Sequence, residues 1–201
     1  MQPYTYLQHE AELFSKQLIA SRIGQNRYFH NIEHTQLVVK SCRILVEHET
    51  YAPVDYAALI VAAWFHDTGY TVVGPGHEFE SVKIVSGFLE SFNCEKQFIA
   101  LVVDLILSTR VNFTPAHYLA EILCDADLSH LGSPEYKRWE FRLRHELEYS
   151  DGISKTDKEW LEQNISFFKS HDYYTPQARK LWGIQKDQNL RLLELNLVRT
   201  V

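Results

Sequence analysis

Apolar residues recur at helical spacing along most of the chain. The segment from Ile32 to Glu49 places its apolar residues largely along one side, which predicts a helix packed against a core. The next segment, Asp55 to His66, is rich in Ala and apolar nearly all round, as is typical of a helix buried on several sides. Residues 77–92 and 94–109 are two more segments of helical length, although β-branched residues weaken the second prediction. The pattern favours an all-α fold.

Capping signals mark three helix starts in the last third of the chain. A hydroxyl side chain ahead of a helix accepts a free backbone N–H, and proline fits the first helical position. The signals are Ser133 followed by Pro134, Thr156 with Glu159 as a capping box, and Thr175 followed by Pro176. The last predicted helix, Gln177 to Leu197, either covers the core or forms part of a homodimer contact.

Length and composition narrow the class of protein. A chain of 201 residues with no recognisable linker is expected to form a single domain, residues 1–201. A formal net charge of −6 argues against nucleic acid or an anionic membrane as partner. Cys42, Cys94 and Cys124 form no CxxC pair, which favours a reducing compartment. Because no secretory signal or membrane span is recognisable, we expect a cytoplasmic protein.

The dipeptide His66-Asp67 follows the most apolar predicted helix at the point where that helix ends. A buried carboxylate is costly unless it is paired or bound to a metal, and a neutral imidazole beside it can coordinate the same ion. The structural alternative is that Asp67 caps the next turn and His66 is a hydrogen-bonded core histidine. His34, near the start of an earlier helix, and the pair Asp125 and Asp127 supply further ligands.

Two His and two Asp from three separate helices would make a mixed nitrogen and oxygen site. Such a set suits a divalent Mn, Mg, Fe, Co, Ni or Zn ion. The order H…HD…D resembles the defining pattern of the HD superfamily of metal-dependent phosphohydrolases. The segments RYFHNIEH, WFHDTGY, GHEFESV, LILST, ILCDADLSHLG and FRLRHEL resemble successive blocks of its small single-domain members, over about residues 26–149.

This resemblance implies an HD-type helical bundle with a metal site in its core. The motif-bearing core would be about residues 26–149, with C-terminal helices in 156–201 packed on it. Asp125 would then begin a helix or support the ligands. The implied metal ligands are His34, His66, Asp67 and Asp127.

The resemblance also implies hydrolysis of a small phosphorylated substrate, with a nucleotide as the favoured class, by a metal-activated water. Asp67 would orient the water as well as bind metal, while His30, His77 or Glu78 would transfer protons. Glu78 and Ser81 would line the mouth of the pocket, or else form a solvated first helical turn. His77 is also a candidate for substrate or a second metal. The candidates for holding phosphate are Arg110, Arg142 and Arg144, whose alternative is a salt-bridged surface.

Other functions compete with this hypothesis. HNIEH matches the inverted zinc-protease motif, in which His30 and His34 bind zinc and Glu33 acts as the base. A metal-stabilised sensor or interaction module without turnover is a second alternative. A di-iron oxygenase of the HD type is a third, but Arg110 stands after LILST where dinuclear relatives have histidine, and His117 comes only later. The C-terminal aromatics are assigned to core and rim packing rather than base stacking: Trp160, Phe167, Phe168, Tyr173 and Tyr174.

Overall fold

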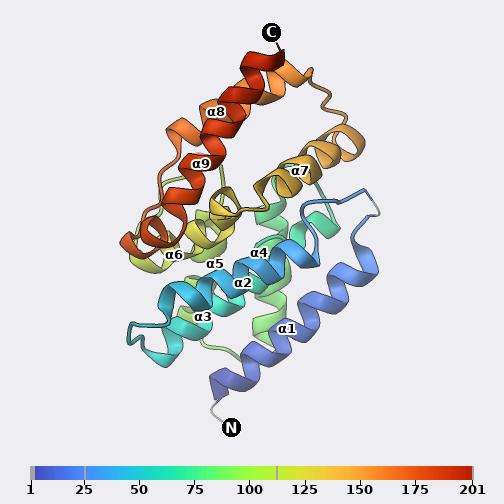
Figure 1. Cartoon of the computed structure of the whole chain (residues 1–201). Coiled ribbons are helices and arrows are strands. Elements are labelled where there is room, and N and C mark those ends of the chain that lie inside the picture. Colours follow the sequence, from blue (N-terminus) through green and yellow to red (C-terminus); the bar gives the residue numbers. More distant parts are fainter. Residues whose placement is uncertain (1–2, 25, 112, 201) are drawn as a thin grey trace.

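The computed structural model describes residues 3–24, 26–111 and 113–200, and every regular element within them is a helix (Figure 1). This confirms the all-α prediction. The α-helices are α1 Pro3–Arg22, α2 Ile32–Val46, α3 Pro53–Phe65, α4 His77–Ser91, α5 Lys96–Ser108, α6 Tyr118–Asp127, α7 Tyr136–Ser150, α8 Asp157–Ser170 and α9 Pro176–Thr200. Two 3-10 segments, η1 Thr68–Thr71 and η2 Leu128–Gly132, follow α3 and α6.

Helix α3 is the centre of the fold. It packs against α1, α2, α4, α5 and α6, and all its residues from Ala57 to Phe65 are buried. The sequence predicted this, because a helix that is apolar all round needs neighbours on every side. Burial continues through His66 and Asp67, so the polar residues that end α3 lie inside the protein.

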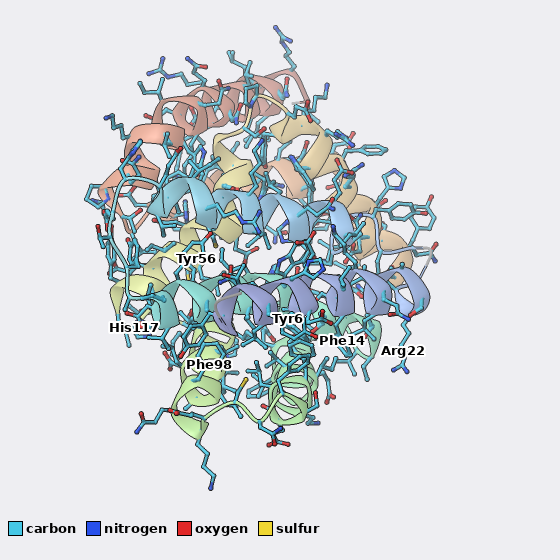
Figure 2. All side chains as sticks on the ribbon, turned by 90° about the horizontal axis from the view of Figure 1, so that it is seen from below. Tyr6, Phe14, Arg22, Tyr56, Phe98 and His117 are labelled. Atoms are coloured by element: carbon cyan, nitrogen blue, oxygen red, sulfur yellow. The ribbon has the colours of Figure 1, made fainter. Side chains whose placement is uncertain are left out.

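Helix α1 was not predicted, and it covers α3 from outside. Figure 2 looks onto α1, with Tyr6 and Phe14 on the side of the helix that meets α4 and α5. Two hollows flank this helix. One of about 650 Å³ is lined partly by Tyr6 and Phe98, and one of about 870 Å³ partly by Phe14 and Arg22. None of the predicted ligands lines either hollow.

The last helices form a second layer at the opposite end of the molecule from α1 (Figure 1). Helix α9 packs on α8 and η2 around a second apolar cluster that includes Leu131, Phe168 and Leu193. Among the C-terminal aromatics, Trp160, Phe168 and Tyr173 are buried while Phe167 and Tyr174 are partly exposed, as expected for core and rim packing.

Of the three helix starts predicted from capping signals, two are confirmed and one is wrong. Thr156 and Glu159 form the predicted capping box of α8, and the Thr175 hydroxyl accepts a hydrogen bond from the Ala178 N–H at the start of α9. The predicted start at Ser133 was wrong, because α7 begins at Tyr136. The Ser133 hydroxyl instead accepts the Glu135 N–H within the turn that lies ahead of α7. Within the described residues, no helix is both long and apolar enough to cross a membrane.

Candidate metal centre

Three helix ends bring the predicted ligands together. His34 lies in the first turn of α2, whose start is fixed because the Asn31 side chain accepts the N–H groups of Glu33 and His34. His66 and Asp67 follow the last residue of α3, and Asp127 is the last residue of α6. Since α2, α3 and α6 pack on one another, residues 93 positions apart in the sequence become neighbours.

The side-chain atoms converge closely. Nε2 of His34 lies 3.0 Å from Oδ1 of Asp127 and 3.4 Å from Oδ2 of Asp67. Nε2 of His66 lies 3.2 Å from the same Asp67 oxygen and 3.6 Å from the same Asp127 oxygen. One ligand atom each from His34, His66 and Asp127 lies within 4.8 Å of the others. Two imidazole nitrogens and two carboxylates therefore surround one small space.

The hydrogen bonding of this group fits a metal ion. Nδ1 of His66 donates to the Ala63 carbonyl at 2.8 Å, which leaves Nε2 as the nitrogen whose lone pair can coordinate. Within the described part of the chain, His66 Nε2 and Asp67 Oδ2 are buried with no aligned hydrogen-bond partner. Buried groups of this kind need a cation among them, because each would otherwise lose its hydration without compensation.

Without a metal, protons supply that positive charge. Burial disfavours the imidazolium form of His66, but the charges of Asp67 and Asp127 outweigh it and hold the pKa of His66 well above 6.5. For the two carboxyls, burial acts in the opposite direction. The neighbouring His66 and, for Asp127, the hydrogen bond with His34 nevertheless keep the pKa of both Asp67 and Asp127 well below the usual range. Both aspartates are thus ionised acceptors.

Asp125 and Asp127 have separate roles. The buried Asp125 carboxylate accepts the N–H of Tyr174 at 2.8 Å and both the N–H and the hydroxyl of Thr175, at 2.8 and 2.7 Å. These groups lie at the start of α9. Asp125 therefore holds the start of α9, and not the start of its own helix α6. Asp127 is the aspartate that contacts the two histidines.

His30 lies beside this group in the segment before α2. Its ring Nδ1 bonds to Oε1 of Glu146, a buried residue of α7. Burial lowers the pKa of His30, but the Glu146 hydrogen bond and the charges of Asp67, Glu146 and Asp127 raise it further, so the net pKa is above 6.5. The pKa of His30 is thus raised by Glu146 together with the charges of the two aspartates of the site.

His77, at the start of α4, closes the other side. Its Nε2 lies 3.2 Å from Oδ1 of Asp67, and its Nδ1 lies 3.8 Å from Oε2 of Glu78. Tyr70 stacks on both His30 and His77, each with ring centroids 3.9 Å apart. Glu78 is only 8% exposed, so the alternative of a solvated first turn is wrong for this residue.

Ser81 does not line a pocket mouth. It is fully buried, and its hydroxyl donates to the His66 carbonyl at 2.6 Å and accepts the Gly69 N–H at 2.8 Å. A Cβ on Gly69 would stand 1.9 Å from the His77 carbonyl oxygen. Ser81 and Gly69 thus lock η1 against α4, which fixes Asp67 relative to His77.

The three candidate arginines differ in what they already bind. Arg142 donates to Glu33 at 2.7 Å, and Arg144 is engaged with Glu148 and Asp157. Arg110 bonds only to the Leu107 carbonyl among the described contacts and stacks over Phe79 and Phe113. Phe79 belongs to the first turn of α4, so Arg110 stands next to the turn that carries His77. Arg110 is the candidate left with donors for a phosphate.

The zinc-protease alternative is wrong. It needs His30 and His34 on one helical face, but α2 begins at Ile32 and His30 lies ahead of its capping residue. The proposed base, Glu33, is 43% exposed in its side chain and paired with Arg138 and Arg142. His117 is likewise outside the centre, at the surface near the edge of the molecule in Figure 2, where it pairs with Asp104 at 2.8 Å.

Sequence reasoning missed four residues at the site: Tyr70, His130, Glu146, and Arg27, which donates to Glu146 at 3.1 Å and lies over the Tyr70 ring. Of these four, only His130 could have been suspected from the local sequence, because it lies three residues after the predicted ligand Asp127. Its Nδ1 donates to the Asp127 carbonyl at 3.1 Å, and burial together with the charge of His34 lowers its pKa to about 4. Glu146 could not be singled out, because it lies among several charged residues of α7.

The HD-domain profile matches residues 31–132, just over half of the 201 residues. The chain belongs to the HD-domain family. This is a superfamily of metal-dependent phosphohydrolases, and the matched segment holds the HD dipeptide His66-Asp67 together with His34 and Asp127. No curated protein matches the chain at a significant level.

Proposed function

We propose that this HD-domain protein is an active metal-dependent phosphohydrolase, which cleaves a phosphoester of a small molecule, with a nucleotide as the favoured substrate class. The observation that carries the proposal is the convergence of His34, His66 and Asp127 on one buried space, with Asp67 Oδ2 at 3.2 to 3.4 Å from both imidazoles. We assign these four side chains as the metal ligands.

A divalent metal bound there would act as a Lewis acid on a phosphoryl oxygen and lower the pKa of a coordinated water. The protein would supply the rest. Asp67 has one oxygen toward His34 and His66 and the other 3.2 Å from His77, so it is placed to orient a water as well as to bind metal. Two oxygens with different neighbours allow one carboxylate to serve both roles.

The leaving group needs a proton, and His30 is our first candidate to donate it. Burial lowers its pKa, but the hydrogen bond with Glu146 and the charges of Asp67 and Asp127 raise it further, which favours the protonated form that a proton donor needs. His77 is the second candidate, with Glu78 beside its other nitrogen as the group that orients it. Glu78 would then act as a positioning residue for His77 and would not itself transfer a proton.

Substrate phosphate would be held by Arg110. Its guanidinium stands beside the first turn of α4, whereas Arg142 is neutralised by Glu33. A guanidinium fork matches two phosphate oxygens, and a free one costs no ion pair to recruit. Among the described residues, no contact at this site selects one base or sugar, so the nucleotide class rests on the family.

The test is metal analysis of the purified protein together with phosphate release from a panel of nucleotides and simple phosphate esters. We expect about one divalent metal per chain and phosphate release by the wild type. His66→Ala and Asp127→Asn should lose both. The matched controls are His117→Ala and Asp104→Asn, which disrupt a His–Asp pair at the surface and should change neither.

The possible outcomes separate the hypotheses. Metal bound by the wild type but not by His66→Ala, without phosphate release from any compound, would favour the metal-stabilised interaction module. Metal retained by both site variants would show that the ligands are misassigned. Oxygen consumption with an iron-loaded protein, in place of phosphate release, would favour the oxygenase.

A further inference from the structure

The outer face of α9 carries a line of exposed apolar side chains, here called the α9 stripe. Their exposed fractions run from 42% to 77%. At 3.6 residues per turn they fall within about one third of the helix circumference and extend over about 26 Å of its length. The stripe consists of Leu181, Ile184, Leu192, Leu195 and Val198.

This face is distinct from the one that α9 uses within the fold. The opposite side of the helix buries Ala178, Lys186, Asn189 and Leu193, where α9 packs against α8 and η2. In Figure 1 α9 runs along the outside of the molecule. Single exposed apolar residues are ordinary, but an aligned row on a helix that already buries its other side indicates an interface.

Four of the five positions of the stripe, all except Val198, are symmetric about Gln188. Leu181 lies seven positions before it and Leu195 seven after, while Ile184 lies four before and Leu192 four after. Two copies of α9 placed antiparallel around a two-fold axis at Gln188 would therefore set Leu181 against Leu195 and Ile184 against Leu192. A two-fold interface requires this self-complementarity.

The charges along one edge of the stripe come within two positions of the same symmetry, an offset of about 3 Å along the helix. Four charged residues lie on that edge, and all are exposed or partly exposed: Lys180, Asp187, Arg191 and Glu194, the last of which also pairs with Lys169 of α8 at 2.7 Å. In the antiparallel pair the same edges of the two helices meet, which brings Lys180 to Glu194 and Arg191 to Asp187 of the other copy. Parallel pairing would instead set this edge against the other edge of the partner helix, where Gln185 and Asn196 lie, so the four charges would not meet and only the antiparallel arrangement pairs them.

We propose that this face binds a second copy of the chain, as an antiparallel α9–α9 homodimer with its axis at Gln188. The occupant is a second copy because both the apolar positions and the charges match their own reversal. The centre of the helix pair would be apolar apart from Gln188, and its edge would be neutral in sum. This inference does not depend on the proposed hydrolase activity.

The first experiment is sedimentation of the wild type over a range of concentrations, beside charge variants. We expect a dimer that Ile184→Glu weakens by roughly 100-fold or more. Arg191→Glu alone and Asp187→Arg alone should each be monomeric, because each creates four like charges at the axis. The double variant Asp187→Arg with Arg191→Glu should dimerise again, and the two single variants should form a heterodimer when mixed.

Cross-linking tests the register. Gln188→Cys should form an intermolecular disulfide, because two copies of this position meet at the axis. Leu181→Cys should not link to itself, since the two copies of that position would lie about 21 Å apart along the helix pair. It should link to Leu195→Cys on mixing. The unsubstituted protein controls for its own three cysteines.

All of these side chains are exposed, so melting followed by circular dichroism should show every variant folded. A wild type with a dimer Kd above about 1 mM would overturn the proposal. So would a dimer that survives both single charge reversals, which would have to use another surface.

Discussion

Nδ1 of His30 donates a hydrogen bond to Oε1 of Glu146 at 2.5 Å, across 116 positions of sequence. The other oxygen of the carboxylate accepts the backbone N–H groups of Phe29 and His30 at 2.7 and 3.0 Å, and Arg27 adds a guanidinium N–H at 3.1 Å. A single buried side chain of α7 therefore holds the segment that leads into α2. Since α2 carries His34 one turn later, α7 takes part in placing a ligand.

Replacing this carboxylate should cost stability. Glu146→Gln removes the buried charge that Arg27 and His30 face and points an amide N–H toward groups that are donors. We expect the free energy of unfolding in urea to fall by about 3 kcal/mol. The control is Glu148→Gln, which breaks a partly exposed pair with Arg144 and should change stability by less than about 0.5 kcal/mol. An equal effect of both would contradict the role of Glu146.

The same pair predicts a pH dependence. Burial raises the pKa of Glu146, but its hydrogen bond with His30 lowers it more, to a net value below 4.5, while the pKa of His30 is above 6.5. The contribution of Glu146 is present above pH 4.5 and is lost as pH falls through its folded pKa. That of His30 is present below pH 6.5 and is lost as pH rises through its folded pKa.

The stability difference between wild type and Glu146→Gln should consequently be largest between about pH 4.5 and 6.5 and should shrink on both sides. Urea unfolding at a series of pH values measures it. A difference that stays constant from acid to alkaline pH would show that the two groups do not titrate as a pair.

Asp125→Ala should separate structure from metal binding. It leaves the N–H groups of Tyr174 and Thr175 without their acceptor in a buried place, which we expect to cost about 3 kcal/mol. Metal affinity measured by calorimetry under folding conditions should stay within about threefold of wild type. Asp127→Asn should instead abolish metal binding, and without metal it should also lower stability, because Asp127 pairs with His34 and His66. Loss of metal by Asp125→Ala, in a protein shown to be folded, would contradict this division.

Gly69→Ala should damage both stability and the site. The added methyl would meet the backbone of His77 at 1.9 Å, and neither η1 nor the start of α4 can move aside without displacing Asp67. We expect a loss of about 3 kcal/mol and reduced phosphate release. Gly87→Ala, in the middle of α4 with open space around it, should instead stabilise by about 0.5 to 1 kcal/mol. Thermal melting of both variants makes the comparison.

Arg110→Ala should weaken substrate binding, whereas Arg142→Ala should remove only a structural ion pair. Loss of the free guanidinium should raise KM for the best phosphate ester about tenfold with a smaller change in kcat. Arg142→Ala, which removes a partner of Glu33, should leave KM unchanged. If steady-state kinetics show the larger KM effect for Arg142→Ala, the phosphate site lies on the α7 side instead.

Much of this architecture could be predicted from the sequence, because it depends on the local pattern of apolar and capping residues. The apolar surround of α3 predicted its central place, and the capping box at Thr156 and Glu159 predicted the start of α8. His34, His66 and Asp127 could be grouped because each ends or begins an apolar helix, and the helices of one core must meet.

The remainder depends on contacts that no local pattern contains. Glu146 and Glu148 are two residues apart in a charged helix, yet only Glu146 is buried, because a distant segment folds over it. Arg110 and Arg142 are chemically equivalent in sequence, and only the position of Glu33 separates them. Helix α1 has a weak apolar pattern and gains its order from packing on α3.

The position of Asp125 has a consequence for where this protein can be cut. The segment that matches the family ends at Gly132, yet among the described residues the Asp125 carboxylate within that segment accepts hydrogen bonds only from Tyr174 and Thr175, which lie beyond it. The end of the segment is equally dependent, since Gly132 lies directly against Trp182 of α9. A fragment limited to residues 31–132 would contain every proposed metal ligand. It would nevertheless leave the Asp125 carboxylate without the N–H groups at the start of α9 that bind it in the full chain. Shared sequence marks what the family has in common, while the smallest piece that can stand alone is set by where each buried charge finds its partner.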